Sequence, residues 1–126
     1  MERYLVQLNS LFSKYQEIKL VYLFGSQINN KQSLLSDYDF AVYFNPDTSL
    51  SRQKDIVLEL ISEISAILKS DKVDLIVLNK ALSPLLKYNI IRGSLIYQQD
   101  PYKILVEPAI YNEYFDFKTF TQRFTQ

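Results

Sequence analysis

Residues 18–44 read IKLVYLFGSQINNKQSLLSDYDFAVYF, which is two apolar runs joined by a polar stretch. The first run, 18–24, is rich in β-branched and aromatic side chains and stops at Gly25, which predicts a short buried strand. The second run, 37–44, ends at an Asn-Pro pair that is typical of a turn, and it predicts another strand. These two strands organise the rest of the fold.

The remaining sequence alternates between helical and strand patterns. Apolar residues three and four apart predict helices, most clearly over 49–69, and short apolar runs predict further strands. The predicted helices are 2–15, 49–69, 82–91 and the tail from 101, and the further strands are 72–78 and a possible edge strand at 94–98. We therefore expect one α/β (α+β) domain over 1–126, with a small mixed β-sheet and helices packed mainly on one face.

Composition excludes several kinds of chemistry. The 126 residues contain no cysteine and no histidine, which excludes disulfides, thiolate or imidazole zinc sites and Ser-His-Asp triads. Fourteen basic residues balance fourteen acidic ones, and no Lys/Arg cluster is present, so we expect no direct nucleic-acid binding. Catalysis would have to use carboxylates, hydroxyls, Lys, Arg or a bound ion.

The sequence carries no signal for export or for a membrane. Its first ten residues, MERYLVQLNS, contain early charges and no long apolar core. No apolar run approaches the roughly 18 residues that a membrane span needs. We expect a cytoplasmic protein.

Three aspartates lie within predicted strands. Asp37 and Asp39 are two apart and therefore face the same side of their strand. Asp74 lies inside the run 72–78, so the three carboxylates could converge if the two strands are neighbours. Because like charges repel, such a cluster favours a divalent cation, and oxygen ligands with open positions suit Mg²⁺ or Mn²⁺.

Gly25-Ser26 follows the first strand directly and is predicted to open a helix. Glycine allows backbone to approach a ligand closely. A serine hydroxyl and the free amides of a helix start can hold a phosphate oxygen. Together with the acids, this pair predicts a site for a metal-bound nucleoside triphosphate.

The spacing of Gly25-Ser26, ten residues, Asp37-x-Asp39 and a later strand Asp74 resembles the nucleotidyltransferase superfamily that includes polymerase beta. The short chain and its C-terminal RGSLIYQQD…YNEYFDF resemble the minimal nucleotidyltransferases, antitoxins paired with HEPN-domain ribonuclease toxins. The resemblance covers most of the chain. It implies a nucleotidyltransferase fold that transfers AMP from ATP to a hydroxyl of a cognate HEPN toxin, where the family acceptor is a tyrosine.

The same resemblance implies roles for individual residues. Gly25 and Ser26 match the phosphate-contacting pair, and Asp37 and Asp39 match the acids that hold the metal ions. Asp74 matches the third acid, which helps to bind one metal and to deprotonate the incoming hydroxyl. Between the two motifs, QINNKQSLL carries one cation, Lys31, where the family often has arginine and a second glycine.

The tail, 101–126, is crowded with aromatic side chains and is a possible partner surface. Core packing and a partner interface both remain open for Phe117, Phe120 and Phe124. Two other functions also remain open: a catalytically weak module that inhibits the toxin by contact, and a nucleotidyltransferase that acts on a small molecule.

Overall fold

The computed structural model describes residues 2–25 and 38–124 of the chain. Its elements follow the order predicted above, with short 3₁₀ turns added at Glu2–Tyr4 (η1) and Leu78–Lys80 (η2). The helices are α1 (Leu5–Phe12), α3 (Leu50–Leu68), α4 (Pro84–Ile91) and α5 (Tyr102–Phe124), and the strands are β1 (Ile18–Phe24), β2 (Tyr38–Phe44), β3 (Val73–Val77) and β4 (Ser94–Gln98). The helix predicted directly after Gly25 lies outside the described residues.

The four strands form one mixed sheet in the order β3-β2-β1-β4. β1 is antiparallel to both β2 and β4, whereas β2 and β3 are parallel. The expected small mixed sheet is therefore confirmed, and β4 is an edge strand. The arrangement places the C-terminal end of β1 beside the N-terminal ends of the other three strands, so four chain segments meet at one end of the sheet.

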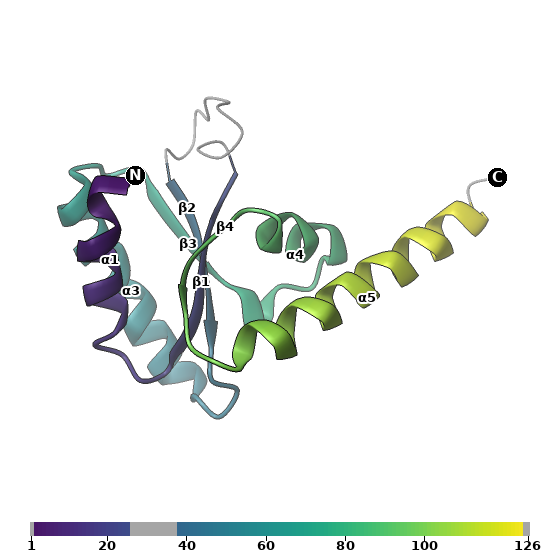
Figure 1. Cartoon of the computed structure of the whole chain (residues 1–126), viewed down its shortest axis with the longest axis horizontal. Coiled ribbons are helices and arrows are strands. Elements are labelled where there is room, and N and C mark those ends of the chain that lie inside the picture. The colour runs from purple at the N-terminus through teal and green to yellow at the C-terminus, as the bar shows by residue number, and fades with distance from the viewer. Residues whose placement is uncertain (1, 26–37, 125–126) are drawn as a thin grey trace.

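Helices cover both faces of this sheet, which differs from the expected concentration on one face (Figure 1). The larger core lies between the sheet and α1 and α3, where Phe12, Ile56 and Leu60 are fully buried. A smaller core lies under α4 and the first half of α5 and includes Leu20 and Ile90. The second core could form because β2 is apolar on both faces, so each face needed a cover.

The alternation of β2 separates these two cores. Phe40, Val42 and Phe44 pack in the larger core, and Ala41 and Tyr43 belong to the smaller one. Because side chains alternate along a strand, Asp39 lies on the face of Ala41, the face that α4 and α5 cover. This placement decides which helices can contribute to a site around Asp39.

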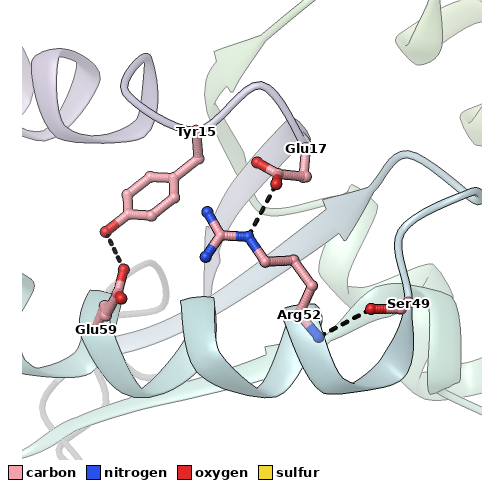
Figure 2. Close-up of polar contacts among 5 residues, drawn as sticks. All are labelled: Tyr15, Glu17, Ser49, Arg52 and Glu59. Carbon is pink, nitrogen blue, oxygen red and sulfur yellow. Dashed lines mark hydrogen bonds and ion pairs between the residues drawn. The ribbon is translucent and has the colours of Figure 1, made fainter.

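α3 is anchored at its N-terminus to the segment that precedes β1 (Figure 2). Ser49 caps the helix, with its hydroxyl accepting from the Arg52 amide at 3.1 Å. Arg52 Nε donates to Glu17 Oε2 at 2.9 Å, and the Tyr15 hydroxyl donates to Glu59 Oε2 at 2.8 Å. These contacts fix the 13–17 connection against α3 on the face opposite to Asp39.

The Tyr15–Glu59 contact predicts a pH-dependent contribution to stability. Burial, followed by the hydrogen bond to Glu59, raises the pKa of Tyr15 from 10.0 to about 12. Since the folded pKa is above the unfolded one, the neutral phenol stabilises the fold below pH 10, and this contribution is lost as the pH rises toward 12.

We expect Tyr15→Phe to lower the free energy of unfolding at pH 8 by about 0.5 kcal/mol, a small value because the contact is partly solvated. Urea unfolding at several pH values measures this difference, which should shrink between pH 10 and pH 12. Glu59→Gln is the matched variant, because it removes the charge and keeps an acceptor. A Tyr15→Phe difference that stays constant up to pH 12 would contradict the assignment.

α5 begins against the sheet and then extends away from it (Figure 1). Near its start, the buried Tyr22 hydroxyl donates to Glu107 Oε2 at 2.6 Å, and burial raises the pKa of Tyr22. The helix continues through Pro108, although a proline inside a helix often kinks or ends it. Proline removes the hydrogen bond to the carbonyl of Ile104, a residue on the solvent side of the helix, 74% exposed.

Within residues 2–25 and 38–124, no helix combines the length and the hydropathy that a membrane-spanning segment requires.

Candidate functional site

Two of the predicted acids lie side by side at the end of the sheet where four chain segments meet. Asp39 of β2 pairs in register with Asp74 of β3, and on its other side it pairs with Phe24 of β1. Neighbouring strands are about 4.8 Å apart, so the two carboxylates start from adjacent backbone positions on the same face. Gly25 follows Phe24 directly and lies one residue beyond this row.

Gly25 packs directly against the carboxylate of Asp39. A Cβ atom at position 25 would lie 2.6 Å from Asp39 Oδ2, closer than real Cβ atoms approach another atom, and 3.4 Å from its Cγ. Gly25 also has φ of +82°, in the region that residues with a Cβ rarely adopt. Contact and backbone conformation therefore both require glycine here, and the end of β1 is built around Asp39.

The two acids differ in their surroundings. Asp39 is partly buried beneath the α4 side of the sheet, whereas Asp74 is exposed. Asp74 Oδ1 accepts a hydrogen bond from the amide of Leu75 at 2.9 Å. Among the described residues no cation forms an ion pair with Asp74. Two carboxylates in adjacent register repel one another, so their pairing favours a positive charge between them.

The donor chemistry of this pair fits a hard divalent cation. Mg²⁺ prefers oxygen ligands and commonly binds one or two protein carboxylates, with water and substrate phosphates completing its shell. Within the described ranges 2–25 and 38–124, no group of three acidic, histidine or cysteine side chains is placed to hold a metal ion. Asp39 and Asp74 thus supply two candidate ligands, while the predicted residues Ser26 and Asp37 lie outside the described residues.

A cleft of about 570 Å³ opens beside Gly25. Its wall on the far side from the acids is formed by α4 and the turn that enters β4. The lining residues are Phe24, Gly25, Leu86, Tyr88, Asn89, Arg92 and Gly93. The cleft is large enough for part of a nucleotide, and its position next to the acids makes it the candidate substrate site.

Arg92 is held in this cleft by Tyr88. Arg92 Nη1 donates to the Tyr88 hydroxyl at 2.8 Å, and the guanidinium carbon lies 5.5 Å from the centre of the same ring. This hydrogen bond raises the pKa of Arg92 above its ordinary value. The Tyr88 ring is in turn stacked on Tyr114 of α5, with ring centres 3.8 Å apart and planes 8° from parallel.

Sequence reasoning did not identify this second wall. Arg92-Gly93 entered only as the start of the stretch RGSLIYQQD that carried the resemblance, and neither Arg92 nor Tyr88 had an assigned role. Their approach to Gly25 depends on the pairing of β4 with β1 and on the packing of α4 against α5. Arginine next to glycine at a helix-to-strand turn was the available signal, because this combination can bring a cation and exposed backbone to a phosphate.

The chain is similar to one described family. The sequence profile of the family described as polymerase beta, nucleotidyltransferase matches residues 6–102. The match includes all four strands and the positions of Gly25, Asp39, Asp74 and Arg92, and it ends as α5 begins. No curated protein matches this chain.

Solved structures extend the likeness to almost the whole chain. A mutant of an MntA toxin–antitoxin complex has a chain with 25% identity and a TM-score of 0.69, over 98% of this chain and 93% of that one. A toxin–antitoxin with AMP-PNP has a chain with 23% identity and a TM-score of 0.68, over 97% of this chain and 93% of that one. The structure of tri-AMPylated Shewanella oneidensis HEPN toxin in complex with MNT antitoxin has a chain with 22% identity and a TM-score of 0.64, over 97% of this chain and 90% of that one. The shared fold therefore includes α5.

Proposed function

Because this chain belongs to the polymerase beta nucleotidyltransferase family, we propose that it is a metal-dependent protein adenylyltransferase that acts as an antitoxin. It transfers AMP from ATP to a hydroxyl, a tyrosine in this proposal, of a cognate HEPN ribonuclease toxin and thereby neutralises it. The observation that carries the proposal is the in-register pair Asp39 and Asp74 beside Gly25, whose missing Cβ accommodates the Asp39 carboxylate.

Each group has a part in the transfer. The toxin hydroxyl oxygen forms a bond to the α-phosphorus, the bond from that phosphorus to the β-bridging oxygen breaks, and pyrophosphate leaves with the bonding electrons. Asp74, exposed at the start of β3, accepts the proton of the hydroxyl. The missing Cβ of Gly25 lets the Asp39 carboxylate lie directly beside the backbone that the phosphates would approach.

Asp37, Asp39 and Asp74 are the residues that would hold Mg²⁺ or Mn²⁺, with Ser26 and Gly25 at the phosphates. A bound divalent ion supplies charge neutralisation at the triphosphate and lowers the pKa of a hydroxyl near it. The partly buried position of Asp39 keeps its carboxylate against Gly25, which fixes the direction in which its oxygens point. The protein thus contributes mainly orientation and preorganised charge.

The direct test mixes the chain with Mg²⁺, ATP and its cognate HEPN toxin, which is to be sought among the neighbouring genes. With ATP labelled at the α-phosphate, the label should become covalently attached to the toxin, whereas label at the γ-phosphate should not. The pair of labels separates AMP transfer from phosphorylation. Absence of α-label on a toxin that the chain binds would contradict the proposed activity.

Exposed aromatic side chains on the second half of α5 favour a second candidate, inhibition of the toxin by contact. Phe115, Phe117 and Phe120 are 52%, 43% and 61% exposed, so core packing does not account for them. The side chain of Phe124 lies outside the described residues. This half of α5 also projects beyond the sheet, where a partner could reach it (Figure 1).

We expect the double variant Phe117→Ser/Phe120→Ser to bind the toxin at least about tenfold more weakly, because exposed aromatics dominate protein interfaces. Titration calorimetry with the toxin measures this change. Leu58→Ser, which alters an exposed apolar residue on α3, is the matched control. If the double variant binds as tightly as the wild type, α5 is not the docking surface.

An Asp39→Asn chain that neutralises the toxin without transferring AMP would support inhibition by contact alone. The two candidate functions therefore give different results with one variant.

A further inference from the structure

At the end of the sheet that carries the acids, a cation, Arg92, lies beside Gly25. Leu23 pairs with Ser94, the last pair of the β1–β4 ladder. Gly25 and Arg92 each lie two residues beyond that pair, in opposite chain directions, so they are neighbours across the opening of the cleft. Asp74, Asp39 and Phe24 form one in-register row, and Gly25 and Arg92 lie one residue beyond it on the strand β1 and on the segment that enters β4. Negative charge therefore lies on the β2 side of the glycine and positive charge on its β4 side.

Arg92 keeps its charge available to a ligand. Among the described residues no carboxylate forms an ion pair with it, whereas Lys87 is paired with Glu113 and Arg52 is paired with Glu17. The partner of Arg92 is instead a neutral phenol, that of Tyr88. One guanidinium edge is held by this hydrogen bond, and the fork of an arginine has further donors that match phosphate oxygens.

The backbone around Arg92 is fixed as well. Arg92 is the C-cap of α4, and its amide donates to the Tyr88 carbonyl at 3.2 Å, while the Gly93 amide donates to the Ile90 carbonyl at 3.0 Å. Tyr88 itself is clamped by its stacking on Tyr114. The guanidinium is therefore preorganised, so that a ligand which binds it loses little additional side-chain entropy.

From this geometry we propose that Arg92 binds the β- and γ-phosphates of the nucleotide from the side of the cleft opposite the acids, and that Tyr88 positions it. The inference rests on the proposed nucleotidyltransferase function and assigns the direction in which the triphosphate lies. Three strand spacings, about 14 Å, separate β3 from β4. The acids hold the α-phosphate region where transfer occurs, and the remaining phosphates extend over Gly25 toward Arg92.

Charge favours this direction over the reverse one. The β- and γ-phosphates carry most of the negative charge of ATP, so the guanidinium attracts them, while the charge of the acids would be balanced by the divalent ion proposed between them. Arg92 also faces the group that leaves, since pyrophosphate gains negative charge as the bond to the α-phosphorus breaks. A guanidinium at that position stabilises the developing charge.

The test compares two nucleotides that differ in the phosphates concerned. Titration calorimetry with Mg²⁺ measures the affinities of the full chain for AMP-PNP and for AMP. We expect Arg92→Gln to weaken the binding of AMP-PNP about 10- to 100-fold, because a charge-assisted contact to phosphate is lost. The affinity for AMP should change less than about threefold. Arg92→Lys should fall in between, since it keeps the charge without the fork.

Tyr88→Phe tests the positioning role, because it keeps the ring that stacks on Tyr114 and removes the hydroxyl. We expect it to weaken the binding of AMP-PNP about three- to tenfold in the wild type and to cause almost no further loss of affinity in an Arg92→Gln background. Arg3→Gln is the matched control and should leave both affinities unchanged, because η1 packs with α1 on the other face of the sheet and Arg3 does not line the cleft.

The outcomes separate this inference from the function on which it rests. If wild-type chain binds AMP-PNP and Arg92→Gln binds it equally well, the assignment of Arg92 is wrong and the proposed function stands. An equal loss of AMP and AMP-PNP would place Arg92 at the base or at the α-phosphate and would also overturn it. If the wild type binds no AMP-PNP with Mg²⁺, both the inference and the proposed function fail.

Discussion

The Asp39→Asn variant is expected to fold like the wild type and to transfer AMP at least about 10³-fold more slowly. It loses a metal-binding charge worth several kcal/mol, and each 1.36 kcal/mol corresponds to a tenfold change in rate. Asparagine has nearly the same shape as aspartate, so the contact with Gly25 is kept while the charge is removed. Asp39 pairs with Asp74 on one side and with Phe24 on the other, which makes it the central position of the row.

Initial rates of AMP transfer to the toxin, measured at saturating Mg²⁺ and ATP, test this expectation. Thermal unfolding of each variant verifies that the fold is retained. Asp55→Asn is the control, since it removes the same charge from an exposed position of α3 on the other face of the sheet. If Asp39→Asn retains a rate within about tenfold of the wild type, Asp39 is not a metal ligand.

The Gly25→Ala variant should lose both stability and activity. The left-handed backbone alone costs about 1–2 kcal/mol for a residue with a Cβ. In addition, the new methyl group would lie 2.6 Å from Asp39 Oδ2, so either the carboxylate or the backbone must move. Because the transfer depends on where Asp39 points, we expect about a 10²-fold loss of rate, in line with the effect of a 1 Å displacement.

A double-mutant cycle separates the two causes. In an Asp39→Ala background the clashing oxygen is absent, and Gly25→Ala should then cost only the backbone part of its penalty. Urea unfolding of the wild type, both single variants and the double variant gives the coupling free energy, expected at about 1 kcal/mol or more. A penalty for Gly25→Ala that is equal in both backgrounds would show that the Asp39 contact contributes nothing.

Local sequence patterns were sufficient for most of the fold. The β-branched run before Gly25 and the alternation after Asp37 defined β1, β2 and the face on which Asp39 lies, because each signal is contained in one short segment. The distribution of helices over both faces was not predicted. It depends on whether α4 and α5 find apolar partners such as Leu20 and Ala41 on the sheet, which is a long-range property.

The candidate site shows the same division. Spacing pointed to Gly25, Asp39 and Asp74, but their contact depends on the parallel register of β2 and β3 and on the turn at Gly25. Arg92 carried no local signal strong enough to assign it. Its position follows from the β1–β4 ladder and from the stacking of Tyr88 on Tyr114, two interactions between segments distant in sequence.

The central claim is that the site around Asp39, at one end of the sheet, catalyses the covalent transfer of AMP to a protein. Intact-mass spectrometry of the HEPN toxin, after incubation with this chain, ATP and Mg²⁺, tests it most directly. We predict one or more mass increments equal to AMP, mapped by peptide analysis to a hydroxyl side chain and missing when Asp39→Asn replaces the wild type. A toxin that is bound and neutralised while its mass remains unchanged would contradict the claim.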